Sequence, residues 1–112
     1  MKSVLTALTL ALLTTAVHAA TPDDAGLKLA NENACMTCHA VDHKIIGPSF
    51  QAIAARFRNN PQAPAYLLDR LEHGSRGDWG RTFMPPFPQA SRQALQQLVQ
   101  WVLSQQGSNS GR

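Results

Sequence analysis

The chain has 112 residues, of which 44% are hydrophobic and 15% charged, and its formal net charge is +3. This length fits one domain, and the composition excludes a disordered or collagen-like chain. Two cysteines are too few for a disulfide-stapled miniprotein or an all-cysteine zinc site within one chain. The densest basic pair, Arg56 and Arg58, has few aromatic neighbours and indicates a solvated face rather than a nucleic-acid surface.

The first segment has the pattern of a secretory signal peptide. Lys2 is its only charge, residues 4–17 are apolar or threonine, and Val17-His18-Ala19 supplies small residues at the usual cleavage positions. We expect residues 1–19 to be removed, with cleavage after Ala20, or an uncleaved anchor, as the alternatives. Residues 20–112 then form one exported domain. No second hydrophobic segment is apparent, so we expect this mature domain to be soluble and without a membrane span.

Four stretches of the mature chain are predicted to be helices. They run from Thr21 to about Asn33, from Pro48 to Arg58, from Pro64 to about His73, and from Ser91 to Gln106. Thr21 and Ser91 are good N-caps, and Gly74 and Gly107 are typical stops. In the second stretch apolar residues recur at i, i+3, i+4 and i+7, which is the spacing of an amphipathic helix.

Residues 74–89 are predicted to be a long loop. They contain three glycines and three prolines, and no alternating strand pattern of useful length occurs anywhere in the chain. The predicted fold class is therefore all-α. A loop of this length inside a small domain is uncommon unless it serves a function.

The run Cys35-Met36-Thr37-Cys38-His39 carries the clearest chemistry. C-x-x-C-H is the spacing of c-type haem attachment. Two thiols at this spacing can form thioethers with two vinyl groups on one porphyrin edge, and His39 then offers its imidazole to the iron. A thioredoxin-like redox pair, part of a zinc site with His39, His43 or His73, and a strained disulfide are the alternatives. Export and the helical pattern favour haem attachment.

A second axial ligand has to come from elsewhere in the chain. The candidates are Met36, His43, His73 and Met84. Met36 lies within the attachment segment, His43 follows His39 by four residues, and His73 ends a helix, where a cation is favourable. Met84 stands in a proline-stiffened, non-helical segment, which suits a presented ligand better than a core filler. We expect Met84 to be the ligand.

Taken together, these segments resemble the small bacterial class I monohaem cytochromes c, most closely the cytochrome c-551 type. The resemblance covers nearly the whole mature chain. It is carried, in this order, by Cys35-Met36-Thr37-Cys38-His39-Ala40, Ile46-Gly47-Pro48-Ser49-Phe50, Gly74-Ser75-Arg76-Gly77-Asp78-Trp79-Gly80, Met84-Pro85-Pro86 and Trp101-Val102-Leu103-Ser104.

The resemblance implies about four helices and a long Met-ligand loop wrapped around one covalently bound haem c. It implies thioethers at Cys35 and Cys38, iron ligation by His39 and Met84, and a Pro48 carbonyl that accepts the His39 Nδ1–H. Two further residues, Trp79 and Arg70, would hydrogen-bond a haem propionate. Pairing of Arg70 with Asp69 or Glu72 on the surface is the alternative for that residue.

Packing expectations follow from the same reading. Trp101 should pack on the first helix, where Ala30 replaces a frequent aromatic, and Phe87 replaces a frequent Asn beside the Met ligand. An apolar pocket is expected to exclude water from the haem. Its predicted members are Phe50, Ile53, Phe57, Leu67, Leu71, Phe83, Leu98 and Trp101.

The function implied is one-electron transfer by a monomeric periplasmic carrier, not an enzyme. By resemblance, its partners would be periplasmic or membrane-bound redox proteins such as a nitrite reductase, a cytochrome c peroxidase or a terminal oxidase. Two alternatives stay open. The first is a haem sensor or enzyme whose Met84 bond yields to peroxide, NO or CO, and the second is a zinc-binding module at Cys35, Cys38 and His39.

Overall fold

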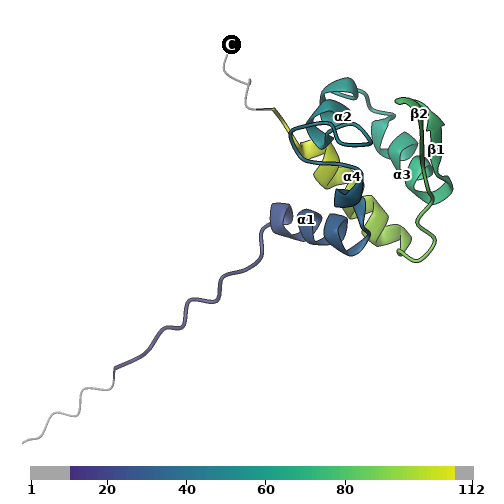
Figure 1. Cartoon of the computed structure of the whole chain (residues 1–112). Helices are drawn as coiled ribbons and strands as arrows, with labels where there is room; N and C mark the ends of the chain where they lie inside the picture. The colour runs from purple at the N-terminus through teal and green to yellow at the C-terminus, as the bar shows by residue number, and fades with distance from the viewer. Residues whose placement is uncertain (1–10, 108–112) are drawn as a thin grey trace, which may run out of the picture.

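The computed structural model describes residues 11–107, and within them the four predicted helices are confirmed (Figure 1). In chain order the elements are α1 (Pro22–Glu32), the short 3₁₀ helix η1 (Cys35–Thr37), α2 (Phe50–Arg56), α3 (Ala63–His73), β1 (Ser75–Gly77), β2 (Gly80–Met84) and α4 (Arg92–Ser104). The observed α2 is shorter than predicted at both ends, because Ser49 is its N-cap and Phe57 its C-cap.

The helices begin where short side chains satisfy their first backbone N–H groups. At α1, Thr21 and Asp24 form a reciprocal capping box, with Pro22 following the cap. The hydroxyls of Ser49 and Ser91 accept hydrogen bonds from the backbone N–H groups three residues on, at 3.0 and 3.1 Å. These local contacts explain why the helix starts are readable from sequence.

The core forms around α4, which contacts α1, α2 and α3. Trp101 is buried there, with its ring edge-on to Phe50 at 5.0 Å between centroids, and Ala30 is fully buried in the same cluster. α1 and α4 approach closely at Gly26, where a Cβ atom would lie only 2.0 Å from Cγ of Trp101. The expected contact of Trp101 with the first helix is therefore confirmed, and it depends on a glycine.

The prediction that residues 74–89 form a loop throughout is wrong. β1 and β2 form an antiparallel hairpin with Ser75 opposite Met84 and Arg76 opposite Phe83, and with an irregularity before Gly77. In Figure 1 this hairpin lies beside α3. Its strands are three and five residues long, so no alternation could develop in the sequence. Gly77 and Gly80 have positive φ angles of 87° and 107°, which lets the chain reverse there.

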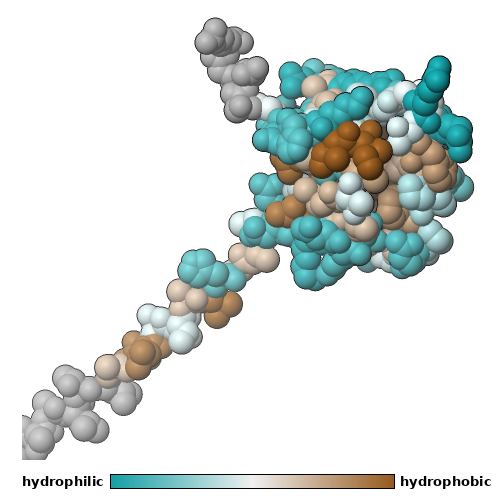
Figure 2. All heavy atoms as spheres, viewed as in Figure 1, coloured by the Kyte–Doolittle hydropathy of each residue, from teal (hydrophilic) through white to brown (hydrophobic). Residues whose placement is uncertain are grey.

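The N-terminal segment runs away from the domain (Figures 1 and 2). Residues 11–20 are exposed and outside any helix or strand, and Leu12, Leu13 and Val17 are among the exposed large apolar side chains. Half of the expected signal peptide, residues 1–10, lies outside the described residues, so its removal stays a prediction. Across residues 11–107, no helix is long and apolar enough to cross a membrane.

Candidate functional site

A cavity of about 340 Å³ opens between the attachment segment, α2, α3, the hairpin and α4. Its wall is mostly apolar. The structure brings all seven residues singled out in the sequence to this wall. They are Cys35, Cys38, His39, Pro48, Arg70, Trp79 and Met84.

The apolar members of the wall were largely predicted. Six of the eight expected residues line the cavity, namely Phe50, Ile53, Leu67, Leu71, Phe83 and Leu98. The prediction is wrong for Phe57, which stands in a tilted stack with Tyr66 at 5.4 Å, and for Trp101, which fills the core behind the wall. Phe57 continues the apolar spacing of α2, and Trp101 is a buried residue of α4, but a helical period does not separate a cavity wall from the core behind it.

The two cysteines enter the wall from a tight turn. Ala34 adopts the left-handed conformation with φ of 57° and starts η1, so Cys35 and Cys38 come from one turn of chain. Both thiols are free. Burial raises the pKa of Cys35 to about 11. The thioredoxin-like alternative needs a βαβ pattern, whereas residues 11–107 form helices and one two-stranded antiparallel sheet.

The imidazole of His39 is held from two sides. Its Nδ1–H donates to the Pro48 carbonyl at 2.6 Å, as the resemblance implied, and its ring stacks on Phe50 at 5.2 Å. Because Nδ1 makes this hydrogen bond, Nε2 is the ring nitrogen left free to bind a metal, which is the usual arrangement of a metal-binding histidine. A Cβ atom on Gly47 would lie 2.7 Å from Cε1 of His39. Gly47 is therefore a functional residue that the sequence reasoning quoted but gave no role.

Of the four candidates for the second ligand, Met84 is the one found among the cavity-lining residues. It ends β2, directly before Pro85 and Pro86. Met36 packs against the core cluster instead. The exposed side chain of His43 pairs with Asp42 at 2.8 Å, and that of His73 pairs with Asp69 at 3.0 Å.

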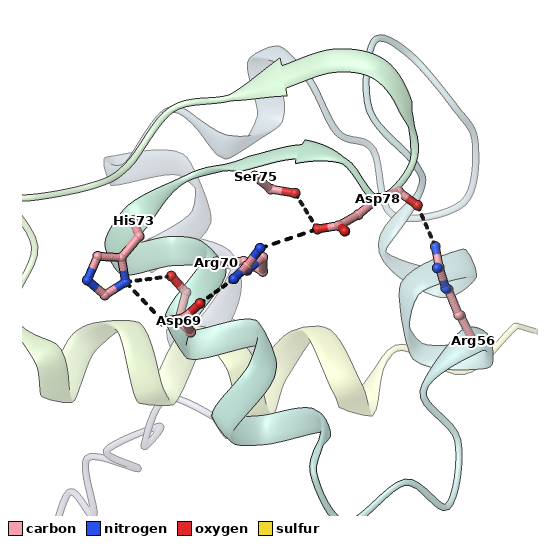
Figure 3. Close-up of polar contacts among 6 residues, drawn as sticks. All are labelled: Arg56, Asp69, Arg70, His73, Ser75 and Asp78. Carbon is pink, nitrogen blue, oxygen red and sulfur yellow. Dashed lines mark hydrogen bonds and ion pairs between the residues drawn. The ribbon is translucent and has the colours of Figure 1, made fainter.

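A polar network borders one side of the cavity (Figure 3). The guanidinium of Arg70 pairs with Asp69 and, at 3.8 Å, with Asp78, so the alternative pairing with Asp69 is confirmed while Glu72 pairs with Arg92. Arg70 nevertheless lines the cavity as well, and its Nε–H is buried without a hydrogen-bond partner. A buried donor without an acceptor is costly, which points to an anionic or carbonyl group arriving from a ligand.

Trp79 is positioned by a residue that the sequence reasoning missed. The guanidinium of Arg56 lies 4.4 Å from the centre of the Trp79 ring, and its Nη1 donates to the Asp78 carbonyl at 2.8 Å. Arg56 thus ties the end of α2 to the hairpin turn. The only signal in the sequence was a basic residue at a helix end, where the helix dipole alone accounts for it.

The donor set of this cavity fits a haem. Two thiols from one turn, a free imidazole nitrogen, a thioether sulfur and an unpaired guanidinium N–H surround an apolar space. Porphyrin rings are apolar and carry carboxylate groups, and iron takes imidazole and thioether ligands readily.

Comparison with known proteins gives the same answer. The family described as cytochrome c matches residues 24–106. The chain belongs to the cytochrome c family. Cytochrome c-551 of Pseudomonas aeruginosa is 42% identical over 77 residues, covering 69% of this chain and 73% of that protein. Cytochrome c-552 of Nitrosomonas europaea is 37% identical over 76 residues, covering 68% of this chain and 74% of the relative.

Solved structures of the family superpose on this fold. The crystal structure of Nitrosomonas europaea cytochrome c552 matches with a TM-score of 0.69 at 35% identity, covering 71% of this chain and 99% of that one. A class 1 cytochrome from Sideroxydans lithotrophicus matches with a TM-score of 0.64 at 32% identity, covering 75% of this chain and 96% of the other. The class I cytochrome c fold and the c-551 type are thereby confirmed.

Membership in the cytochrome c family implies one covalently attached haem c with its iron, and Cys35 and Cys38 have the spacing for that attachment. The partners of a cytochrome c that carries electrons are other redox proteins. In the part of the chain that the structure describes, no group of three or more His, Cys, Asp or Glu side chains is arranged to hold a metal ion.

Arg56→Gln is expected to lower the free energy of unfolding by about 1–2 kcal/mol, because it removes the cation–π contacts with Trp79 and Phe57 and the hydrogen bond to the Asp78 carbonyl. The measurement is denaturant unfolding of the haem-loaded protein followed by circular dichroism. Arg58→Gln is the matched control, since among residues 11–107 the Arg58 side chain donates to the exposed Gln106 side chain, at 3.1 Å, and not to the hairpin. If both variants lost the same free energy of unfolding, Arg56 would not be the residue that fastens the hairpin.

Proposed function

We propose that this protein is an exported one-electron carrier of the periplasm, with a His/Met-ligated haem, and that it is not an enzyme. The observation that carries the proposal is the meeting of His39 and Met84 on the wall of one apolar cavity that also bears the two cysteines. When bound, the haem would supply the one-electron chemistry at its iron. The residues of the chain then decide what that chemistry can be used for.

The residues that would hold the iron favour electron transfer over reaction at the metal. If Nε2 of His39 and the sulfur of Met84 both bound the iron of a haem in this cavity, no position would be left for a substrate. The Pro48 carbonyl holds the His39 ring in orientation at 2.6 Å. A thioether ligand raises the potential relative to two nitrogen ligands, and the apolar wall raises it further by excluding water.

Arg70 and Trp79 are proposed to hold a haem propionate. The buried Nε–H of Arg70 has no other acceptor, which supports this role, and the indole N–H of Trp79 is a second donor on the same wall. Stacking under Arg56 keeps the Trp79 ring in place. The pair would fix one side of the haem while the thioethers fix another.

Export and partner choice are supported by the N-terminal pattern and by the surface near the cavity. Three residues of the cavity wall, Ile46, Trp79 and Phe83, are also 49%, 38% and 49% exposed. A small apolar surface of this kind suits the brief contacts of redox partners. We propose partners of the respiratory chain, with a nitrite reductase, a cytochrome c peroxidase or a terminal oxidase as the candidates, and a monomeric carrier between them.

The test is expression with haem-maturation machinery, followed by absorption spectroscopy and mass measurement of the periplasmic fraction. We expect the mass of residues 20–112 plus one haem, sharp low-spin bands when reduced, and a weak near-infrared sulfur–iron band when oxidised. A high-spin spectrum with ready CO binding would overturn the carrier function in favour of a sensor or enzyme. A colourless protein containing zinc would overturn haem binding altogether.

A further inference from the structure

The cavity wall carries one carboxylate, that of Asp78. Of the Asp, Glu, Lys and Arg residues within 11–107, Arg70 and Asp78 are the two that line the cavity. A negative charge is unfavourable beside a site for a group that itself carries carboxylates. The presence of Asp78 there therefore indicates that its charge has a role in the site.

Asp78 is held in one position by its neighbours (Figure 3). Its carboxylate accepts a hydrogen bond from the Ser75 hydroxyl at 2.7 Å and lies 3.8 Å from Nη1 of Arg70, while Arg56 binds its backbone carbonyl at 2.8 Å. The hydrogen bond from Ser75, and secondly that from Tyr66, hold the pKa of Asp78 below its usual range. The carboxylate is therefore ionised at neutral pH, and only 27% of the side chain is exposed.

Arg70 pairs with two carboxylates and lines the cavity. Its terminal nitrogens pair with Asp69 on one side and Asp78 on the other, and its Nε–H is left buried and unpaired. A planar guanidinium can serve several acceptors at once, since its five N–H groups point in fixed directions. A haem carboxylate bound at Nε would share this cation with Asp78, whereas Asp69 is not among the cavity-lining residues.

We propose that Asp78 is a positioning and charge-setting residue of the haem site, which orients Arg70 toward the haem carboxylate and lowers the reduction potential by its own negative charge. The inference rests on the proposed one-electron function. Ferric haem carries one more positive charge than ferrous haem. A fixed anion in a wall of low dielectric therefore stabilises the ferric state more. By sharing Arg70, Asp78 also leaves the haem carboxylate less fully neutralised, which acts in the same direction.

The experiment compares the reduction potentials of the haem-loaded wild type, Asp78→Asn and Asp69→Asn, each equilibrated with a reference couple at neutral pH. Each variant removes one carboxylate charge that pairs with the Arg70 guanidinium, but of the two aspartates only Asp78 lines the cavity. We expect Asp78→Asn to shift the electron-exchange equilibrium several-fold toward the reduced protein and Asp69→Asn to shift it clearly less. Equal shifts, or a shift toward the oxidised protein in Asp78→Asn, would overturn the proposal.

Two further variants separate charge from structure. Ser75→Ala removes the hydrogen bond at 2.7 Å but keeps the carboxylate, so its potential should stay near that of the wild type. Asp78→Glu keeps the negative charge, so its potential should lie closer to that of the wild type than to that of Asp78→Asn. A potential of Ser75→Ala equal to that of Asp78→Asn would show a purely structural role and reject charge setting.

The same samples distinguish failure of this inference from failure of the proposed function. The near-infrared sulfur–iron band of the oxidised wild type reports on His/Met ligation, and its absence would contradict the proposed ligands. The ranking of Asp78→Asn against Asp69→Asn is read from the potential alone. It therefore decides the role of Asp78 whichever side chain occupies the distal position.

Discussion

Replacing Met84 with alanine is expected to abolish the near-infrared sulfur–iron band of the oxidised protein, to open the distal position to CO, and to lower the reduction potential. Met84 supplies the thioether on the cavity wall, and the other three candidate ligands lie elsewhere. Losing the thioether removes the ligand that favours the ferrous state. Absorption spectra of both oxidation states and a potential measurement check the three effects.

Met36→Leu is the matched control for this change. Met36 is the other methionine of residues 11–107, and it packs against the core cluster rather than lining the cavity. Leucine has a similar volume, so the fold should tolerate it with a loss below about 1.5 kcal/mol. The band should persist in Met36→Leu, and an unchanged spectrum in Met84→Ala would reject Met84 as the ligand.

Gly26→Ala is expected to destabilise the protein by about 1–3 kcal/mol or more, through overpacking at the α1–α4 crossing. Alanine is the better helix former by about 1 kcal/mol, so intrinsic propensity alone predicts the opposite sign. The added Cβ atom would lie 2.0 Å from Cγ of Trp101, and it would also approach Cδ1 and Cβ of that residue, at 2.2 and 2.3 Å. Denaturant unfolding of the haem-loaded protein gives the free energy.

The matching test is a double-mutant cycle with Trp101→Ala, which removes Cγ and Cδ1, two of the three clashing atoms. If the clash with the indole causes the loss, then the two changes together should cost clearly less than the sum of the single changes. A Gly26→Ala protein more stable than the wild type would show that the helices separate without cost. In that case the close crossing would not be a requirement of the fold.

The parts of this protein that were predictable from sequence are those set by contacts between residues near in the chain. The caps at Thr21, Ser49 and Ser91 act over three residues. The two cysteines and His39 lie within five residues, so their spacing alone predicts the chemistry. The contact of His39 with Pro48 spans nine residues and entered only through family resemblance.

The hairpin and its contacts were not predictable in the same way. Its strands are too short to show a period, and the residue that fastens it, Arg56, lies 22 positions before its acceptor at Asp78. From the sequence, Arg70 was expected either to pair with Asp69 on the surface or to reach the haem. Arg70 pairs with Asp69 and also lines the cavity, because one guanidinium has enough N–H groups for several acceptors.

By itself, the sequence determined the four helices, the haem attachment segment and the residue types that surround the haem, because local spacing and hydrogen bonding encode them. Only the tertiary structure decided which apolar side chains form the cavity wall, why Gly26 and Gly47 must be glycine, and that Asp78 faces the same space as Arg70. The reason is physical. Close approach between distant segments depends on how helices cross and how a hairpin folds over them, and neither has a signature in a short run of residues.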